Sequence, residues 1–189
     1  MRKSAALPAL FLAAALLGGC ASDPELSGAA MQATFDDGLK DYDSGNYQAA
    51  FEKWSSIKDA NPAAARNLAI MLRTGRGVKK DPKAAEQLME LAAEMDLFTA
   101  QADVGDMLLK GEAGPPDPKA AVPWLAMAAK AGHPMAQYEL GQLYEQGLGV
   151  PKNIEAARVL YKAAAAGGVA DAAGRLAALP PEPPPALGH

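Results

Sequence analysis

The chain has 189 residues, one cysteine, two histidines and a formal net charge of −4. Hydrophobic residues make up 50% and charged residues 21%, which is too apolar for a disordered chain. A single cysteine excludes an intrachain disulfide framework and a cysteine-rich zinc site, and we expect no metal or cofactor. The negative charge argues against nucleic acid as the main partner, because no basic excess is available to displace the counterions of phosphate.

The first twenty residues have the pattern of an export signal. Arg2 and Lys3 precede about 13 apolar residues, whereas a helix that spans a bilayer needs about 20. The sequence Leu-Gly-Gly-Cys at residues 17–20 resembles the lipobox of bacterial lipoproteins. This resemblance implies that residues 1–19 are a removed signal peptide and that Cys20 carries acyl chains such as palmitate. The alternative is an ordinary secreted protein with a lone cysteine near a run of small residues.

A lipidated Cys20 would fix the chain to a membrane, since two or more acyl chains give durable anchoring where one is marginal. The next residue is Ala21 rather than aspartate. By resemblance to Gram-negative lipoproteins, this favours the outer membrane, facing the periplasm, in a Gram-negative host. Residues 20–30 then form a short tether between the anchor and the folded part.

The rest of the sequence repeats with a period of 36 residues. Segments 64–99, 100–135 and 136–171 align without a gap, and glycines, alanine pairs and aliphatic residues recur at the same positions. Such self-similarity is typical of repeat architectures in which each unit packs on its neighbours. Each segment contains two helix-period stretches, and the matching alanines allow the helices to approach closely.

The ends of the helices are also repeated. The first helix of each unit should stop at Gly75, Gly111 or Gly147, because glycine readily adopts left-handed backbone conformations. The second should be capped by an aspartate or asparagine, with proline at its first position in two units. The flanking segments are expected to be a tetratricopeptide-like unit at 31–63, a capping helix at 172–179 and a Pro-rich tail at 180–189.

The repeat resembles the Sel-one-like repeat of the tetratricopeptide superfamily. The residues that carry the match are best preserved in the last unit: Leu140-Gly141, Leu143-Tyr144, Gly147, Gly149-Val150, Ala156, Ala164-Ala165 and Gly168. The middle unit departs from the pattern at Ala113 and Gly114. The resemblance implies an all-α fold, a right-handed α-solenoid of stacked antiparallel helix pairs whose first helices line a concave surface.

That concave surface is the predicted site for a protein or peptide segment of the cell envelope. Aromatic anchors and charged side chains suit such a partner. The expected groove residues, four first helices in chain order, are Phe35, Leu39 and Tyr42; Arg66, Ile70 and Arg73; Asp106 and Lys110; and Tyr138, Gln142 and Glu145. Arg66 and Arg73 should make the N-terminal end of the groove basic, and their replacement by glutamate should leave the fold intact.

The sequence therefore favours a lipid-anchored scaffold rather than an enzyme, and we expect no catalytic residue. His133 has no second histidine nearby, and the serines have no histidine partner at a recognisable spacing. The alternative is an envelope hydrolase or binder that acts on a cell-wall or β-lactam substrate. On the structural side, Trp124 is predicted to pack between adjacent units.

Overall fold

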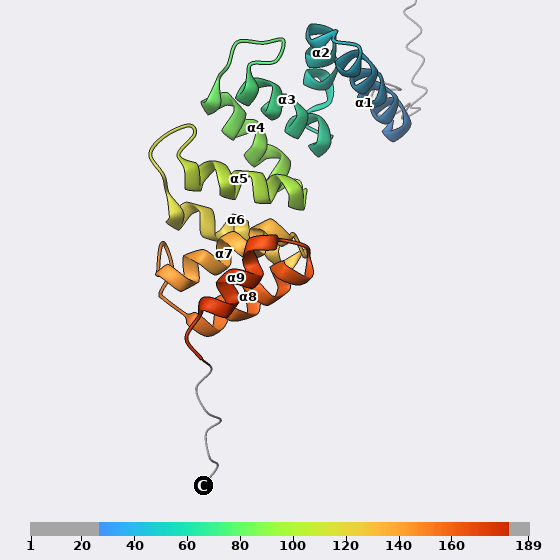
Figure 1. Cartoon of the computed structure of the whole chain (residues 1–189). Coiled ribbons are helices and arrows are strands. Elements are labelled where there is room, and N and C mark those ends of the chain that lie inside the picture. Colours follow the sequence, from blue (N-terminus) through green and yellow to red (C-terminus); the bar gives the residue numbers. More distant parts are fainter. Residues whose placement is uncertain (1–26, 182–189) are drawn as a thin grey trace, which may run out of the picture.

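The computed structural model describes residues 27–181, and within this range the chain is entirely helical apart from turns (Figure 1). The helices stack in chain order from one end of the molecule to the other. This arrangement confirms the predicted all-α solenoid. The helices are α1 (Gly28–Asp43), α2 (Tyr47–Ile57), α3 (Pro62–Thr74), α4 (Pro82–Glu94), α5 (Phe98–Lys110), α6 (Pro118–Lys130), α7 (Pro134–Gln146), α8 (Ile154–Ala166) and α9 (Ala170–Ala178).

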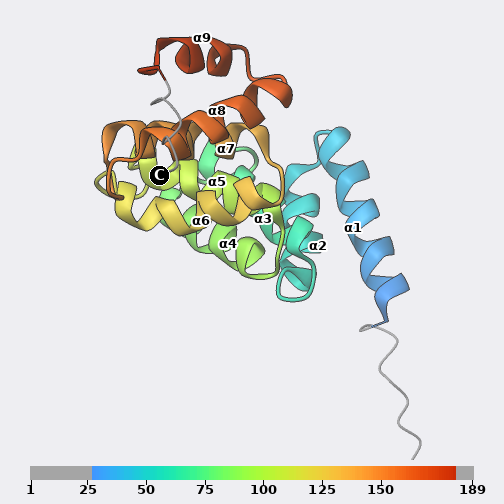
Figure 2. The same cartoon turned by 90° about the horizontal axis from the view of Figure 1, so that it is seen from below.

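Each unit is a pair of helices, and the second helix of one unit packs on the first helix of the next. The first helices α5 and α7 also contact each other directly, and no contact of this extent joins two second helices among the described residues. The first helices therefore lie on the inner side of the stack. Figure 2 shows α1 at one edge of the molecule and α9 lying over α8 at the other.

The turns within the units follow the sequence prediction. Gly75, Gly111 and Gly147 end the first helices with φ of 73°, 66° and 75°. Each of these glycines donates its backbone N–H to the carbonyl four residues earlier, which closes the last helical turn. A residue with a side chain would be strained at this backbone conformation, so glycine sets the length of each first helix.

The second helices begin at the predicted caps. The side chains of Asp81, Asp117 and Asn153 each accept a hydrogen bond from the backbone N–H three residues later, at 3.0, 2.9 and 3.0 Å. At the chain ends, α1 starts at Gly28, so the last residues of the expected 20–30 tether are helical. The final helix α9 starts at Ala170, two residues before the expected 172–179 segment.

The core repeats a contact between a small residue on the first helix and a large one on the second. A Cβ atom placed on the small residue would lie 2.4, 2.4 or 2.8 Å from the large side chain, so only glycine fits. The large side chains are fully buried. The three pairs are Gly38 with Trp54, Gly105 with Leu125, and Gly141 with Tyr161.

Trp124 is less buried than its predicted position between units implied. It packs against the cluster formed by α3, α4 and α5, but its side chain is only half-buried. The next residue, Leu125, points at α5 and is fully buried. Trp124 therefore contacts the neighbouring unit as predicted, but it lies at the edge of the buried face of α6, about 100° around the axis from Leu125.

None of the helices within residues 27–181 is both long and apolar enough to cross a membrane. The expected signal peptide at 1–19, the expected lipidation site Cys20 and residues 182–189 of the tail lie outside the described residues.

Candidate binding surface

A cavity of about 200 Å³ lies between the first helices α1 and α3. Residues three apart on each helix share a face, so Leu39 and Tyr42 of α1 line it opposite Asn67 and Ile70 of α3. Leu39 is 37% exposed, so part of its side chain is open to solvent at the cavity. The structure thus brings together three predicted groove residues, and the full lining is Leu39, Tyr42, Asp43, Trp54, Asn67 and Ile70.

Phe35, the fourth predicted residue in this region, belongs to the support of the cavity rather than to its lining. Its ring packs against Trp54 with the ring centroids 6.1 Å apart. The indole Nε1–H of Trp54 donates a hydrogen bond to the Phe35 carbonyl at 3.2 Å. Phe35 therefore holds the Trp54 ring in place, and Trp54 in turn forms a rigid wall of the cavity.

Tyr42 is held in place by aromatic and cationic neighbours. Its ring centroid lies 5.2 Å from that of Tyr47, edge to face, and 5.6 Å from that of Trp54. Its hydroxyl accepts a hydrogen bond from Arg76 at 2.7 Å, and the same guanidinium lies 5.5 Å from the ring centroid. Arg76 was not predicted at the site, because it follows α3 in a turn and reaches back 34 residues in the sequence.

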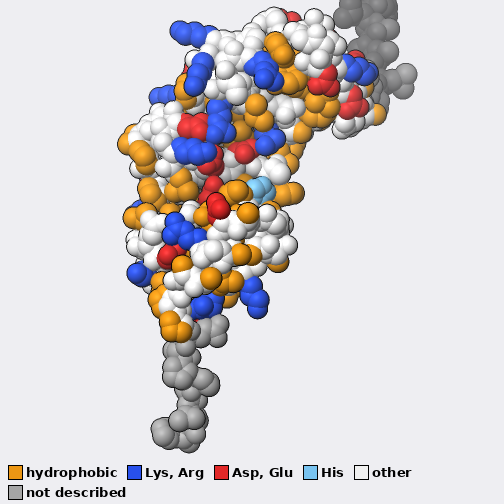
Figure 3. All heavy atoms as spheres, in the orientation of Figure 1, with side chains coloured by type: hydrophobic (Ala, Val, Ile, Leu, Met, Phe, Trp, Pro, Cys, Tyr) orange, Lys and Arg blue, Asp and Glu red, His pale blue; other side chains and the backbone are white. Residues whose placement is uncertain are grey.

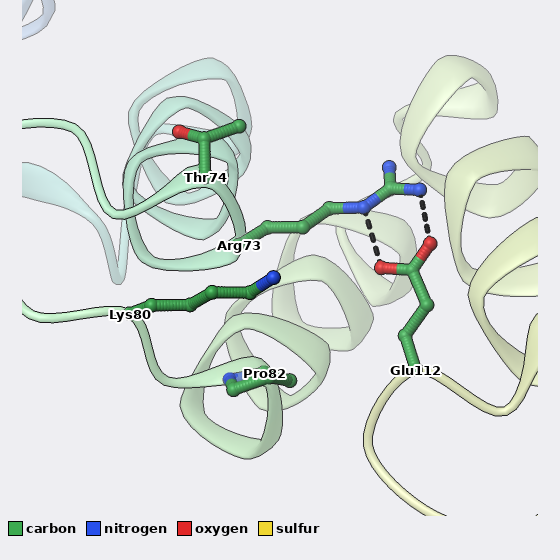
Figure 4. Close-up of a pocket in the computed structure, with 5 residues that line it drawn as sticks. All are labelled: Arg73, Thr74, Lys80, Pro82 and Glu112. Atoms are coloured by element: carbon green, nitrogen blue, oxygen red, sulfur yellow. Dashed lines mark hydrogen bonds and ion pairs between the residues drawn. The ribbon is translucent and has the colours of Figure 1, made fainter.

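The predicted basic end of the groove is wrong, because both arginines are neutralised by the next unit. Arg66 Nε lies 2.7 Å from the Asp103 carboxylate. Arg73 donates from Nε to Glu112 at 2.6 Å and from Nη2 to the other oxygen of the same carboxylate, which makes a two-bond pair (Figure 4). Arg73 also lies 3.3 Å from Asp106. Such pairing with planar geometry is the preferred mode for arginine.

These pairs also change what a charge reversal would do. Glutamate at either arginine position would face carboxylates of α5 or of the following turn, instead of solvent. The structure contradicts the premise that these positions are unpaired, so we expect such variants to be destabilised. Beside the Arg73–Glu112 pair lies an open hollow of about 530 Å³, into which Lys80 also extends (Figure 4).

A second cavity, of about 290 Å³, lies between α5 and α7. The predicted residues Asp106 and Lys110 line it and form an ion pair of 2.8 Å with each other. Glu139 of α7 faces the same cavity, and the structure gives it no ion pair or hydrogen bond within the described residues. Burial, together with the nearby Asp106, raises the pKa of Glu139 to about 7, and Lys110 only partly offsets this shift.

His133 also borders the second cavity, but its side chain already has a structural role. Its Nδ1 accepts a hydrogen bond from the backbone N–H of Ala136 at 3.3 Å, so the imidazole caps α7. The ring of Phe98 lies 6.2 Å away. This capping role was not predicted from the sequence, since histidine is not among the usual capping residues.

The remaining predicted residues lie on α7, where helices α8 and α9 cover the end of the groove. Tyr138 packs with Tyr161 of α8, ring centroids 5.7 Å apart, in a cluster that includes side chains of α9. Glu145 accepts a hydrogen bond from the Tyr161 hydroxyl at 2.5 Å and pairs with Arg175 of α9 at 3.7 Å. Gln142 is partly buried on the same helix. The open part of the surface therefore runs from α1 to the Glu139 side of α7.

The charge of the first helices is predominantly acidic. Together α1, α3, α5 and α7 contain eight acidic and four basic residues, whereas α2, α4, α6 and α8 contain five acidic and six basic ones. In Figure 3, acidic side chains lie over α1 and, interspersed with basic ones, over the middle of the stack. Within residues 27–181, no group of histidine, cysteine, aspartate or glutamate side chains is placed to hold a metal ion.

The repeat pattern identifies the family. The Sel1 repeat matches residues 62–97, 99–133 and 134–169, which is more than half of the chain, so the protein belongs to the Sel1 repeat family. These bounds lie one to two residues before the segments defined by the 36-residue period. Members of this family are in general protein-interaction scaffolds, and the fold is typically non-catalytic. The comparison with curated proteins gives no match.

Solved structures of Sel1-type proteins resemble this chain. A Sel1 repeat protein from Oxalobacter formigenes is 29% identical over 75% of the chain, with a TM-score of 0.69. A protective antigen of uropathogenic Escherichia coli is 29% identical over 77% of the chain, with a TM-score of 0.70. An immunity protein from Pseudomonas aeruginosa is 28% identical over 81%, with a TM-score of 0.50. The chain spans 59%, 32% and 59% of these proteins, respectively.

Proposed function

We propose that the protein is a lipid-anchored scaffold of the cell envelope that binds a protein or peptide segment on the surface of its first helices. The lipobox-like sequence at residues 17–20 supports the anchor, with Cys20 as the acylated residue. Ala21 after it supports the outer membrane, facing the periplasm, in a Gram-negative host. The role is one of binding, in keeping with the general function of the family.

The observation that carries the binding function is the cavity between α1 and α3. Its aromatic wall is fixed by Phe35, Trp54 and Arg76, yet Leu39 and Ile70 remain available at its mouth. A preformed apolar cavity in a rigid frame is suited to one anchor side chain of a partner, because little ordering accompanies binding.

Site-specific crosslinking in cells tests the binding surface. A benzoylphenylalanine at position 39 should capture a discrete envelope protein, whereas the same residue at position 159 should not. Val159 is a matched control because it is 67% exposed on the second helix α8. Identical crosslinking patterns at both positions would reject the α1–α3 surface as the recognition site.

A separate experiment tests the anchor. Cys20→Ser should abolish incorporation of a clickable palmitate analogue and leave an uncleaved or misprocessed precursor, because the modified thiol is absent. The variant should move from the membrane fraction to the soluble fraction or accumulate as precursor. Undiminished palmitate label on the Cys20→Ser protein would reject the lipoprotein assignment and leave the crosslinking result unaffected.

A further inference from the structure

The chemistry of the α1–α3 cavity defines the kind of segment that fits it. We infer that the partner presents a large apolar side chain directly next to a lysine or arginine, with the apolar side chain in the cavity and the cation at Asp43. This inference rests on the proposed binding function and specifies the partner that the site selects.

The size of the cavity favours a single side chain over a small-molecule ligand. Pockets for small molecules usually have volumes of about 300 Å³ or more, whereas this cavity has about 200 Å³. Its walls are the side chains of Leu39, Tyr42, Trp54 and Ile70, which provide apolar contact on both sides. An aliphatic or aromatic anchor would be desolvated there and would contribute most of the binding energy.

Two polar side chains at the same cavity have no partner within the described residues. Asp43, the last residue of α1, is exposed and makes no ion pair or hydrogen bond. Asn67 of α3 is partly buried, and its amide group makes no hydrogen bond. A side-chain amide both donates and accepts, so Asn67 matches the N–H and C=O of a peptide backbone, while a carboxylate matches a cation.

Most of the charged side chains around the cavity already have partners: Arg76, the nearest cation, is bound to the hydroxyl and ring of Tyr42. Arg66 and Arg73, the basic residues on the inner face of α3, are already engaged by Asp103, Asp106 and Glu112. On α1, the other carboxylates are also engaged: Asp37 pairs with Lys40, Asp41 pairs with Lys53, and Asp36 accepts a hydrogen bond from Gln32. Asp43 is thus left to attract a cation from outside.

Glu139, farther along the inner face, supports the same charge preference. It lines the second cavity with Asp103, Asp106 and Lys110, and among these four it is the one that makes no ion pair with another described residue. An acidic partner segment would be repelled by Asp43 at the first cavity and by the ionised form of Glu139 at the second, the two carboxylates that have no ion pair there within the described residues, and like charges brought together at an interface are disfavoured. A basic segment would find complementary charge along the open surface.

A set of synthetic peptides tests the inference directly. Fluorescent 12-residue peptides in a Gly-Ser background would each carry leucine, methionine or phenylalanine followed by lysine, glutamine or glutamate. Binding to the full-length acylated protein in detergent would be measured by fluorescence anisotropy at low salt. The lysine peptides should bind at least tenfold more tightly than the glutamate peptides, with the glutamine peptides in between.

Two variants separate the charge contact from the apolar contact. Asp43→Asn should reduce the lysine-over-glutamine preference to less than twofold while leaving the glutamine peptides unchanged. Leu39→Ala should weaken all apolar peptides by at least threefold. Asp59→Asn, an exposed carboxylate in the turn between α2 and α3, is the matched control and should change nothing. Circular dichroism would verify that each variant is folded.

Other outcomes would overturn the inference in distinguishable ways. Equal binding of lysine and glutamate peptides would reject the charge selection, even if crosslinking at position 39 still captured a partner. No binding by any peptide, or crosslinks from position 39 only to a second copy of the chain, would reject a peptide anchor in this cavity. Loss of the glutamine peptides in Asp43→Asn would show that Asp43 shapes the cavity rather than binding the cation.

Discussion

The ring of Tyr161 lies directly against the backbone of Gly141, so that a methyl group on Gly141 would lie 2.8 Å from the ring carbon Cε1. Tyr161 is fully buried at this place, and its hydroxyl donates a hydrogen bond to Glu145 at 2.5 Å. Burial, and then this hydrogen bond, raises the pKa of Tyr161, so it stays protonated and keeps donating. The close approach of α8 to α7 depends on the absence of a side chain at position 141.

Gly141→Ala should therefore destabilise the protein, although alanine is the better helix former. We expect a net loss of about 1–2 kcal/mol, because overpacking costs about 1–3 kcal/mol and the gain in helix propensity is at most about 1 kcal/mol. Denaturant unfolding of the parent and the variant would measure this loss in the free energy of unfolding. Gly174→Ala on α9, where nothing lies within 4 Å of an added Cβ, should be neutral or slightly stabilising. A stabilised Gly141→Ala variant would contradict the packing described.

The two tryptophans should differ in their contribution to stability. Trp54 is 1% exposed, and Trp54→Ala should cost about 3–5 kcal/mol, as truncation of large buried side chains does. Trp124 is half-buried, so Trp124→Ala should cost about 1–2 kcal/mol, below the range for full burial. The chain contains two tryptophans, so each variant retains one as the fluorescent reporter of unfolding. Equal losses would contradict the difference in burial.

Glu139 should make stability depend on pH near neutrality. Its pKa is about 7 in the folded protein, against 4.5 for the unperturbed group, so the folded state binds more protons between these values. Stability should consequently fall as the pH rises from about 4.5 to 7. We expect a contribution of about 1–2 kcal/mol, allowing for partial exposure of the carboxyl group.

Glu139→Gln should remove this contribution, because glutamine does not ionise. The variant should be more stable than the parent at pH 8 and closer to it at pH 5. Urea unfolding of both proteins across this range isolates Glu139 from Asp103, Asp106, Lys110 and His133, which both proteins retain. Parallel pH profiles would show that Glu139 does not titrate in this range.

The Arg73–Glu112 pair should contribute more than an ordinary surface ion pair. A double-mutant cycle with Arg73→Gln and Glu112→Gln should give a coupling of about 1 kcal/mol, since the geometry is bidentate and both side chains are mostly buried. The exposed Lys40–Asp37 pair should give a clearly smaller coupling in the same experiment, because solvent screens its charges. Equal coupling in the two cycles would contradict the role of burial.

The sequence predicts most of the fold because the signals for it are local. The glycines at the helix ends and the capping residues act within four residues along the chain, so a 36-residue pattern reveals them without knowledge of the packing. The resemblance to tetratricopeptide-type repeats predicts a groove with Leu39, Tyr42 and Ile70 among its residues, and the structure brings these three side chains to one cavity.

The charge of the groove was not predictable in this way, because it depends on contacts between units. Arg66 meets Asp103 and Arg73 meets Glu112, at separations of 37 and 39 residues, so neither pair falls on the repeat period. Helical faces show which side chains point inward, but they do not show which side chains of the next unit lie within reach. For the same reason, the sequence does not predict that α9 packs against Tyr138 and Glu145.

The contact between a small and a large residue has a consequence for the modularity of the chain. Gly105 and Leu125 belong to the same unit, as do Gly141 and Tyr161, so both residues of each close contact lie within one unit. A unit could be duplicated or excised as a cassette of 36 residues without leaving a void or a clash inside any helix pair. The ion pairs of Arg66 and Arg73 link α3 to the following unit, so they would be lost if a different unit followed α3. The number of units can therefore change without disturbing a helix pair, whereas these ion pairs constrain which unit follows which.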